Sequence, residues 1–294
     1  MQKSGFTAIV GRPSAGKSTL LNALCEQKVS IVSDVPQTTR NKVRGIVNRD
    51  QGQIVFVDTP GYHHSSKKFN IHMVDLVRGA CEEVDAVLYL VDTTRPPGEE
   101  ERDMLALVAQ LSRPVIVALN KIDMKTSARS EALHFVLERL PGAEVLEISA
   151  ATGEGLEELL DRLYLEMPEG EPMYPADYYT DQDPVFRVSE IIREKAIHRT
   201  KEELPHALYV EVADMEQRQE NEKEILWIRA FLIVERDSQK GIVVGRGGEK
   251  IKEIRQQAQR EIGKLFPYRV HLDLRVKVHP KWRHKDALLG RLIR

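Results

Sequence analysis

A short glycine-containing run near the N-terminus constrains this chain more than any other feature. Residues 11–18 are Gly-Arg-Pro-Ser-Ala-Gly-Lys-Ser and fit the pattern G-x-x-x-x-G-K-[ST]. The apolar residues 6–10 before it predict a buried strand, and residues 18–24 after it predict a helix. A strand, such a loop and a helix in this order predict a phosphate-binding loop, because backbone N–H groups and the helix N-terminus converge on the anion.

Two side chains of this loop have distinct expected roles. Lys17 would neutralise the outer phosphates, and Ser18 would ligate Mg²⁺. We expect nucleotide contacts from the whole loop and the first helical residues, which are Gly11, Arg12, Pro13, Ser14, Ala15, Gly16, Lys17, Ser18 and Thr19.

A second motif indicates which base is bound. The apolar run 114–119 ends in Asn120, Lys121, Ile122 and Asp123, the arrangement N-K-x-D. A carboxylate at Asp123 can accept hydrogen bonds from guanine N1–H and N2–H, and adenine lacks that pair of donors. We expect Asn120 to tie this loop to the phosphate loop and the Lys121 stem to lie along the base.

Three further segments complete the expected site. A strand over 54–57 leads into Asp58, Thr59, Pro60 and Gly61, where Asp58 would hold Mg²⁺ through water and the Gly61 amide would bond the terminal phosphate. The polar stretch 33–42 would close over the nucleotide, with Thr39 as the second hydroxyl on Mg²⁺ and Thr38 as the alternative. A strand over 145–148 ends in Ser149, Ala150 and Ala151, whose amides would support the guanine oxygen.

Length and composition predict two domains. The chain has 294 residues, and alternating strands and helices up to residue 166 predict a parallel sheet with crossover helices. The proline-containing stretch from Pro168 predicts a linker, so we expect a first domain over 1–167, a linker over 168–182 and a second domain over 183–294. With no long apolar run and no leader pattern we expect a cytoplasmic protein, and we interpret the two cysteines as buried thiols.

The second domain carries a basic glycine motif. Residues 238–294 hold 15 Lys and Arg against 5 Asp and Glu, whereas residues 1–179 hold 19 against 26. The residues before the motif predict a helix over 185–201 and strands over 207–213 and 225–234, with a solvated acidic turn over 214–224. The residues after it predict a helix to 266 and a strand over 269–278. This order of elements matches the bacterial, type II KH fold. Its GxxG loop clamps the backbone of single-stranded nucleic acid. The expected RNA-binding residues are Gly245, Arg246, Gly247, Gly248, Lys250, Lys252 and Arg255.

These motifs together resemble the Era-like family of bacterial GTPases, within the TrmE-Era-EngA superfamily. Gly-Arg-Pro at 11–13, Pro-Gln-Thr-Thr-Arg at 36–40 and Asp-Thr-Pro-Gly at 58–61 carry the resemblance. It implies an α/β P-loop GTPase domain with a mostly parallel sheet, followed by an α+β KH domain. It also implies GTP and GDP as ligands, Mg²⁺ as cofactor, and hydrolysis of GTP with Lys17, Thr39 and Gly61 taking part.

The same resemblance implies the partners. They are single-stranded RNA near the 3′ end of small-subunit (16S) ribosomal RNA and the 30S ribosomal subunit, whose assembly the protein would assist as a monomer. Weak peripheral contact with the inner face of the cell membrane is a further option.

Two positions depart from related patterns. Tyr62 stands where Ras-like GTPases have a glutamine that orients the attacking water, so we expect slow intrinsic hydrolysis, and we interpret His63 and His64 as solvated rather than as bases. Ser14 stands where many family members have an asparagine linked to K⁺ activation. A serine hydroxyl is a shorter ligand, so K⁺ dependence stays open.

Two other functions are compatible with parts of the sequence. A GTP-dependent RNA-modification factor would need a second chemical centre, and none is visible after residue 170. A membrane-surface signalling GTPase would use the basic C-terminal part, which is not strongly amphipathic.

Trp282, among basic residues, fits either an RNA surface or the domain core.

Overall fold

The computed structural model describes residues 2–33, 35, 36, 38–61, 75, 77–125, 128–220 and 223–292. The described chain divides into two compact units, one ending at Asp181 and joined by the last residues from Gly290 onward, the other Gln182–Leu289. Tyr62, His63 and His64, to which the sequence assigned roles, lie outside the described residues.

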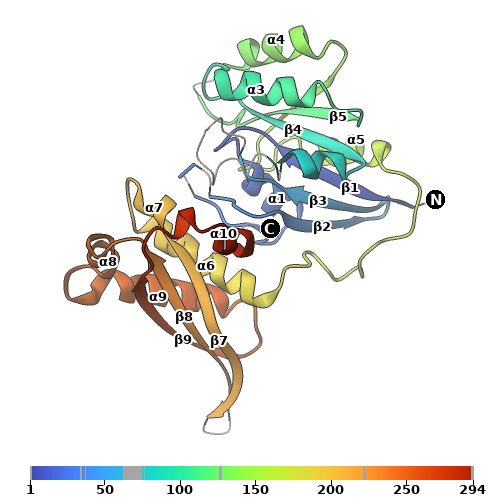
Figure 1. The fold of residues 1–294 in the computed structure, drawn as a ribbon. Coiled ribbons are helices and arrows are strands. Elements are labelled where there is room, and N and C mark those ends of the chain that lie inside the picture. The colour runs from blue at the N-terminus through green and yellow to red at the C-terminus, as the bar shows by residue number, and fades with distance from the viewer. Residues whose placement is uncertain are drawn as a thin grey trace. The chain divides into compact units, whose positions relative to one another are not determined.

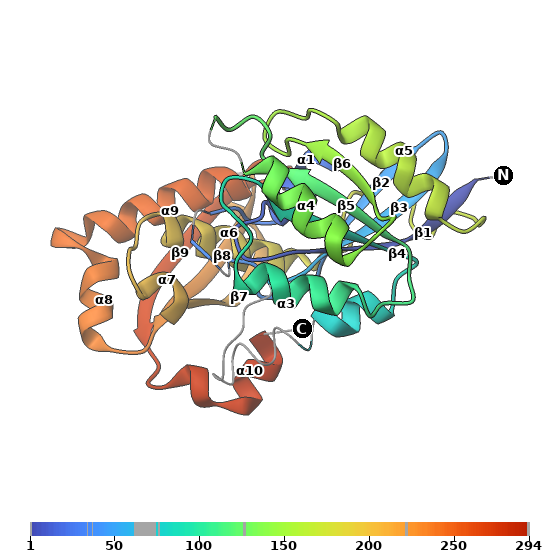
Figure 2. The same cartoon turned by 90° about the horizontal axis from the view of Figure 1, so that it is seen from above.

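The first unit is built on a six-stranded sheet in the order β2-β3-β1-β4-β5-β6, of which β6 is labelled in Figure 2 and the other strands in Figure 1. All neighbouring strands run parallel except β2, which is antiparallel to β3. Every residue of β3 and β4 is buried, as expected for parallel strands covered on both faces. The strands are β1 (Lys3–Val10), β2 (Val43–Arg49), β3 (Gly52–Asp58), β4 (Ala86–Asp92), β5 (Val115–Asn120) and β6 (Glu144–Ile148).

Helices cover both faces of this sheet (Figures 1 and 2). On one face, α3 (Glu99–Val108) and α4 (Arg129–Arg139) pack with β1, β4 and β5 around an apolar core that includes Met104 and Val136. On the other face lie α1 (Lys17–Leu24) and α5 (Leu156–Glu166). The parallel strands all end at one edge, so the loops that follow β1, β3, β5 and β6 meet there.

The residues between α5 and Asp181, which fall within the predicted linker, are hydrogen-bonded to the first unit. Gln53, fully buried on β3, accepts from the Met173 and Tyr174 amides at 2.8 and 3.0 Å and donates to the Tyr174 carbonyl at 2.8 Å. Along β2, the Ile46 amide donates to the Tyr179 carbonyl at 3.0 Å. This part of the predicted linker is therefore anchored on the edge of the sheet.

The second unit places helices on one three-stranded sheet in the order β7-β8-β9. Strands β7 and β8 are antiparallel and β8 and β9 parallel. Alternate residues of β8 are buried, as expected for a sheet with one covered face. The elements are α6 (Pro184–His198), α7 (Leu204–Ala207), β7 (Tyr209–Glu220), β8 (Lys223–Val234), α8 (Asp237–Val244), η1 (Arg246–Gly248), α9 (Glu249–Ile262), β9 (Arg269–Val278), η2 (Trp282–His284) and the first part of α10 (Asp286–Leu292), which extends beyond Leu289.

Two details of this unit differ from or go beyond the sequence prediction. The described residues of the acidic segment 214–224 are strand and not turn: β7 continues to Glu220 and β8 begins at Lys223, paired in register from Asp214 onward. Charged side chains are tolerated there because residues 216–219, 223 and 224 of the two strands are exposed. Trp282 belongs to the core, since it is fully buried, donates from Nε1 to the Ala207 carbonyl at 2.9 Å and meets the Tyr209 ring edge-on.

Candidate nucleotide and RNA sites

The phosphate loop connects β1 to α1 and needs glycine at two positions. Gly11 has φ 154°, and an added Cβ would lie 2.4 Å from the Leu90 carbonyl oxygen. Gly16 has φ 99°, and its Cβ would lie 2.5 Å from Asn120 Nδ2. Side chains at these positions would push the loop away from its neighbours, so the loop conformation depends on both glycines.

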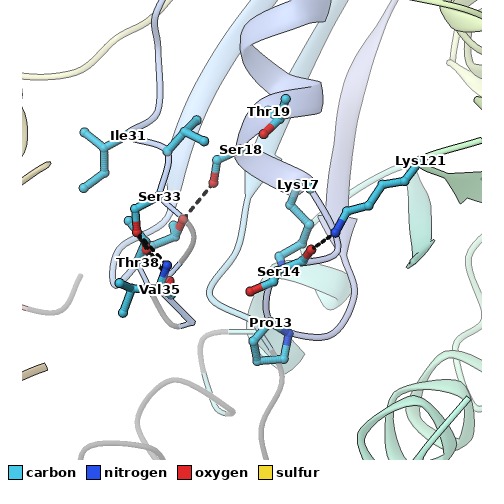
Figure 3. A pocket seen from close by; sticks show the side chains of 14 residues that line it. Pro13, Ser14, Lys17, Ser18, Thr19, Ile31, Ser33, Val35, Thr38 and Lys121 are labelled. Carbon is cyan, nitrogen blue, oxygen red and sulfur yellow. Dashed lines mark hydrogen bonds between the residues drawn. The ribbon is translucent and has the colours of Figure 1, made fainter. Parts of the chain in front are cut away.

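A cavity of about 280 Å³ lies between this loop and the predicted first switch (Figure 3). Its lining brings together residues far apart in sequence, which are Pro13, Ser14, Gly16, Lys17, Ser18, Thr19, Ile31, Val32, Ser33, Val35, Thr38, Thr39, Gly61 and Lys121. The Gly61 backbone packs tightly on the loop, because an added Cβ would lie 2.7 Å from Pro13 Cα. Most of the predicted phosphate-site residues therefore surround one cavity.

Lys17 is buried beside this cavity. Its Nζ donates to the Gly11 and Arg12 carbonyls, each at 3.0 Å. Burial lowers the pKa of Lys17 to about 8, although the nearby carboxylates of Asp58 and Glu101 act in the opposite direction. The ammonium is therefore a poorly solvated charge that an anionic ligand would stabilise.

Ser18 and Thr39 line the cavity, and Ser18 also contacts Asp58. Ser18 Oγ donates to Asp58 Oδ2 at 2.7 Å and lies 2.8 Å from Thr39 Oγ1. Asp58 is fully buried, and its Oδ1 has no hydrogen-bond partner among the described residues. Burial raises the pKa of Asp58 against the opposing charge of Lys17. Two hydroxyls and a carboxylate with a free buried oxygen are a donor set that suits a hard cation such as Mg²⁺.

The neighbouring threonine faces elsewhere. Thr38 Oγ1 donates to the Val35 carbonyl at 2.6 Å and lies 2.6 Å from Ser33 Oγ. It therefore takes part in the local turn of the first switch, whereas Thr39 reaches the Ser18 and Asp58 cluster. Ser30, which the sequence analysis missed, also donates to Asp58 Oδ2, at 2.9 Å, and no local pattern distinguishes it.

The predicted base-binding loop follows β5 and is tied to the phosphate loop. Asn120 Nδ2 donates to the Ala15 carbonyl at 2.8 Å, and Asn120 Oδ1 accepts from the Ala150 amide at 2.9 Å. Ser149 Oγ donates to Asp123 Oδ1 at 2.6 Å, which orients a carboxylate that is otherwise exposed. These bonds join the loops after β1, β5 and β6 at the edge of the sheet.

Lys121 crosses from this loop to the phosphate loop. Its Nζ donates to the Ser14 carbonyl at 2.7 Å (Figure 3) and lies 3.0 Å from Asp92 Oδ2. Asp92 was missed by the sequence analysis, although an acidic residue at the end of a buried strand is a signal that could have pointed to it. Arg12 belongs to the phosphate loop, and its side chain is buried against Asp92 and Glu101.

The GxxG loop of the second unit lies between α8 and α9. Gly245, Gly247 and Gly248 all have positive φ, of 75°, 59° and 80°. A Cβ at Gly245 would lie 2.7 Å from Lys250 Cβ, whereas Gly247 and Gly248 face open space. Arg246 and Lys252 are exposed, and Lys250 and Arg255 are partly exposed. The loop thus presents bare backbone next to cationic side chains, which suits a sugar-phosphate chain.

A loop with the phosphate-loop pattern, the cluster of Ser18, Thr39 and Asp58, and an N-K-x-D loop lie on one edge of a mostly parallel sheet, as in a P-loop GTPase domain, and the second unit has the elements of a KH domain. Two family models agree: one described as "50S ribosome-binding GTPase" matches residues 6–121, and one described as "KH domain" matches residues 203–283. These matches confirm the predicted fold class.

The relatives identify the family. The chain is 51% identical to GTPase Era of Treponema denticola, over 98% of this chain and 99% of the relative. It is 48% identical to GTPase Era of Treponema pallidum strain Nichols, over 99% of this chain and 97% of the relative. The chain therefore belongs to the Era family of GTPases, which confirms the resemblance seen in its motifs.

Solved structures of Era resemble this chain over its whole length. A crystal structure of Era in complex with MgGDPNP and nucleotides 1506–1542 of 16S ribosomal RNA matches with a TM-score of 0.94 at 36% identity, covering 100% of this chain and 99% of that one. A variant of Aquifex aeolicus Era bound to GDP·AlF₄⁻ matches with a TM-score of 0.93 at 36% identity, covering 99% of each chain.

Proposed function

We propose that this chain is a Mg²⁺-dependent GTPase that switches the hold of its KH domain on single-stranded RNA at the 3′ end of 16S ribosomal RNA and so assists assembly of the 30S subunit. The geometry around one cavity carries the GTPase part: Lys17, the Ser18–Thr39–Asp58 cluster and the N-K-x-D loop lie on the same edge of the sheet. The family relationship and the solved Era complex support the RNA part.

The residues of this site have separate roles in hydrolysis. Lys17 neutralises charge on the outer phosphates, including the charge that develops on the leaving GDP as its bond to the terminal phosphorus breaks, and the Gly61 amide donates to the terminal phosphate. Ser18, Thr39 and Asp58 would hold Mg²⁺, which supplies further neutralisation of the phosphate oxygens when bound. Asp123 accepts from the guanine ring and selects the base. Water attacks the terminal phosphorus, and the products are GDP and inorganic phosphate.

The GxxG loop supplies the RNA site. Gly247 and Gly248 leave room for a phosphate close to the backbone, and Arg246, Lys250, Lys252 and Arg255 add positive charge around it. Binding of this kind neutralises phosphates and releases counterions, so it weakens as salt rises. Within the described residues, no helix is long and apolar enough to cross a membrane.

The two adjacent threonines offer a matched test of the Mg²⁺ assignment. Thr39 and Thr38 are similarly buried, at 8% and 9% exposure, but only Thr39 reaches Ser18. We expect Thr39→Ala to raise the Mg²⁺ concentration needed for half-maximal phosphate release from GTP, and Thr38→Ala to leave it unchanged. Equal Mg²⁺ requirements for wild type and Thr39→Ala would contradict the assignment, and hydrolysis of ATP as readily as GTP would contradict the proposed specificity.

A further inference from the structure

A buried chain of charges lies behind the phosphate loop. Arg12 Nη2 donates to the Asp92 carbonyl at 3.0 Å and lies 3.3 Å from Asp92 Oδ2, and Arg12 Nε lies 3.0 Å from Glu101 Oε2. Tyr89 donates from its hydroxyl to Glu101 Oε1 at 2.7 Å. The side chains of Arg12, Asp92 and Glu101 are 3%, 4% and 1% exposed, so their charges are stabilised by one another and not by water.

Asp92 lies at the centre of this chain of charges because of the strand order. Strand β4, which ends at Asp92, lies between β1 and β5, and Asp92 is in register with Asn120. The phosphate loop follows β1 and the base-binding loop follows β5, so Asp92 stands between the two. Its carboxylate meets Arg12 from one loop and Lys121, at 3.0 Å, from the other.

The orientation of the Asp92 carboxylate is set by its other oxygen. Oδ1 accepts from the Thr94 amide at 2.9 Å and from Thr94 Oγ1 at 2.7 Å, while Oδ2 faces the two cations. Burial by itself would raise the pKa of Asp92, but the Thr94 hydrogen bonds and the Lys121 charge bring the pKa below its usual value. The group is therefore an anion with one preferred direction.

We propose that Asp92 is a positioning residue for nucleotide binding: it holds the Lys121 side chain across the base site and joins the base-binding loop to the phosphate loop through Arg12. Lys121 is 30% exposed and has a flexible stem, so without an anion behind it the ammonium gains more from water than from the single Ser14 carbonyl. A side chain held in its bound conformation before the ligand arrives loses less freedom on binding, and the complex dissociates more slowly.

This inference rests on the proposed guanine site, and the dissociation rate of a fluorescent GDP analogue tests it. We expect Asp92→Asn, which removes the charge and keeps the shape, to raise that rate roughly 10- to 100-fold, the range typical of lost positioning groups. Asp85→Asn is the matched control. Asp85 lies just before the other end of β4 and accepts from the Phe6 amide at 2.8 Å, far from the loops, so its rate should match the wild type.

A double-mutant cycle separates positioning from general destabilisation. If Asp92 acts through Lys121, then Asp92→Asn adds little to the dissociation rate in a Lys121→Ala background. The proposal is overturned if Asp92→Asn dissociates GDP like the wild type, or if its effect is as large with Lys121→Ala as without it. Failure of the wild type to prefer GDP over ADP would instead overturn the guanine site itself.

A milder variant covers the case in which Asp92→Asn does not fold. Thr94→Val removes the hydroxyl that orients the carboxylate and leaves every charge in place. We expect a smaller rise in the GDP dissociation rate, again lost in the Lys121→Ala background. A Thr94→Val protein that folds and dissociates GDP at the wild-type rate counts against the proposal.

Discussion

Replacement of Lys17 by methionine should stabilise the nucleotide-free protein while it abolishes tight GTP binding. Burial lowers the pKa of this lysine from 10.5 to about 8. At about 1.4 kcal/mol per pKa unit, keeping the ammonium charged in the fold costs about 3 kcal/mol. Methionine has a similar shape but leaves the Gly11 and Arg12 carbonyls without their donor, which costs about 1 kcal/mol each. The net gain for Lys17→Met is then about 1 kcal/mol at pH 7.

The pH dependence of that gain gives the test its direction. Below pH 8 the lysine is charged in both the folded and the unfolded chain, so its cost is fully present. Between pH 8 and 10.5 the unfolded chain binds the proton and the folded chain does not, so the stability contributed by this group rises with pH. The advantage of Lys17→Met should therefore shrink as pH rises through this window.

Urea unfolding of nucleotide-free wild type and Lys17→Met at pH 7 and at pH 9.5 measures both effects. Saturating GDP should raise the unfolding free energy of the wild type far more than that of the variant. A variant that is less stable than wild type at pH 7, or a stability difference that grows with pH, would refute the reasoning from burial.

Three further results are expected. Asp123→Asn should exchange an acceptor for a donor and shift preference from guanosine to xanthosine nucleotides, measured by competition against a fluorescent GDP analogue; unchanged guanosine preference would remove Asp123 from base recognition. Gly247→Asp should lose most single-stranded RNA affinity in fluorescence anisotropy, with GDP affinity unchanged. The control Gly142→Asp, also at positive φ in open space, should keep its RNA affinity. Equal RNA binding by the two variants would exclude the GxxG loop from the RNA site. Gly11→Ala should weaken GDP binding at least tenfold, because its Cβ would meet the backbone oxygen of Leu90 at 2.4 Å and shift the loop by a sizeable fraction of an ångström, and an isothermal titration that shows wild-type affinity would contradict this.

Much of this protein could be predicted from local sequence. The phosphate loop needs only a strand, glycines at the positions with positive φ and a helix, all contiguous in the chain, so its place and its own residues in the cavity lining were accessible without coordinates. Ile31 and Val32, which also line the cavity, were not predicted. The N-K-x-D loop and the GxxG loop are local in the same sense. Their order along the chain also predicted the family, which the relatives confirm.

The tertiary structure decided which side chains from separate segments contact one another. Arg12 sits inside the phosphate-loop motif, and the pattern placed it with the nucleotide-binding residues, yet its guanidinium lies against Asp92 and Glu101, which follow 80 and more residues later. Likewise, the strand conformation of the acidic segment after Asp214 became evident only from its pairing with β8. The burial of Trp282 became evident only from the packing of the core. A charged or aromatic side chain contacts whichever partner the fold brings close to it. Strand order and burial decide that partner, and a short sequence motif contains no information on either.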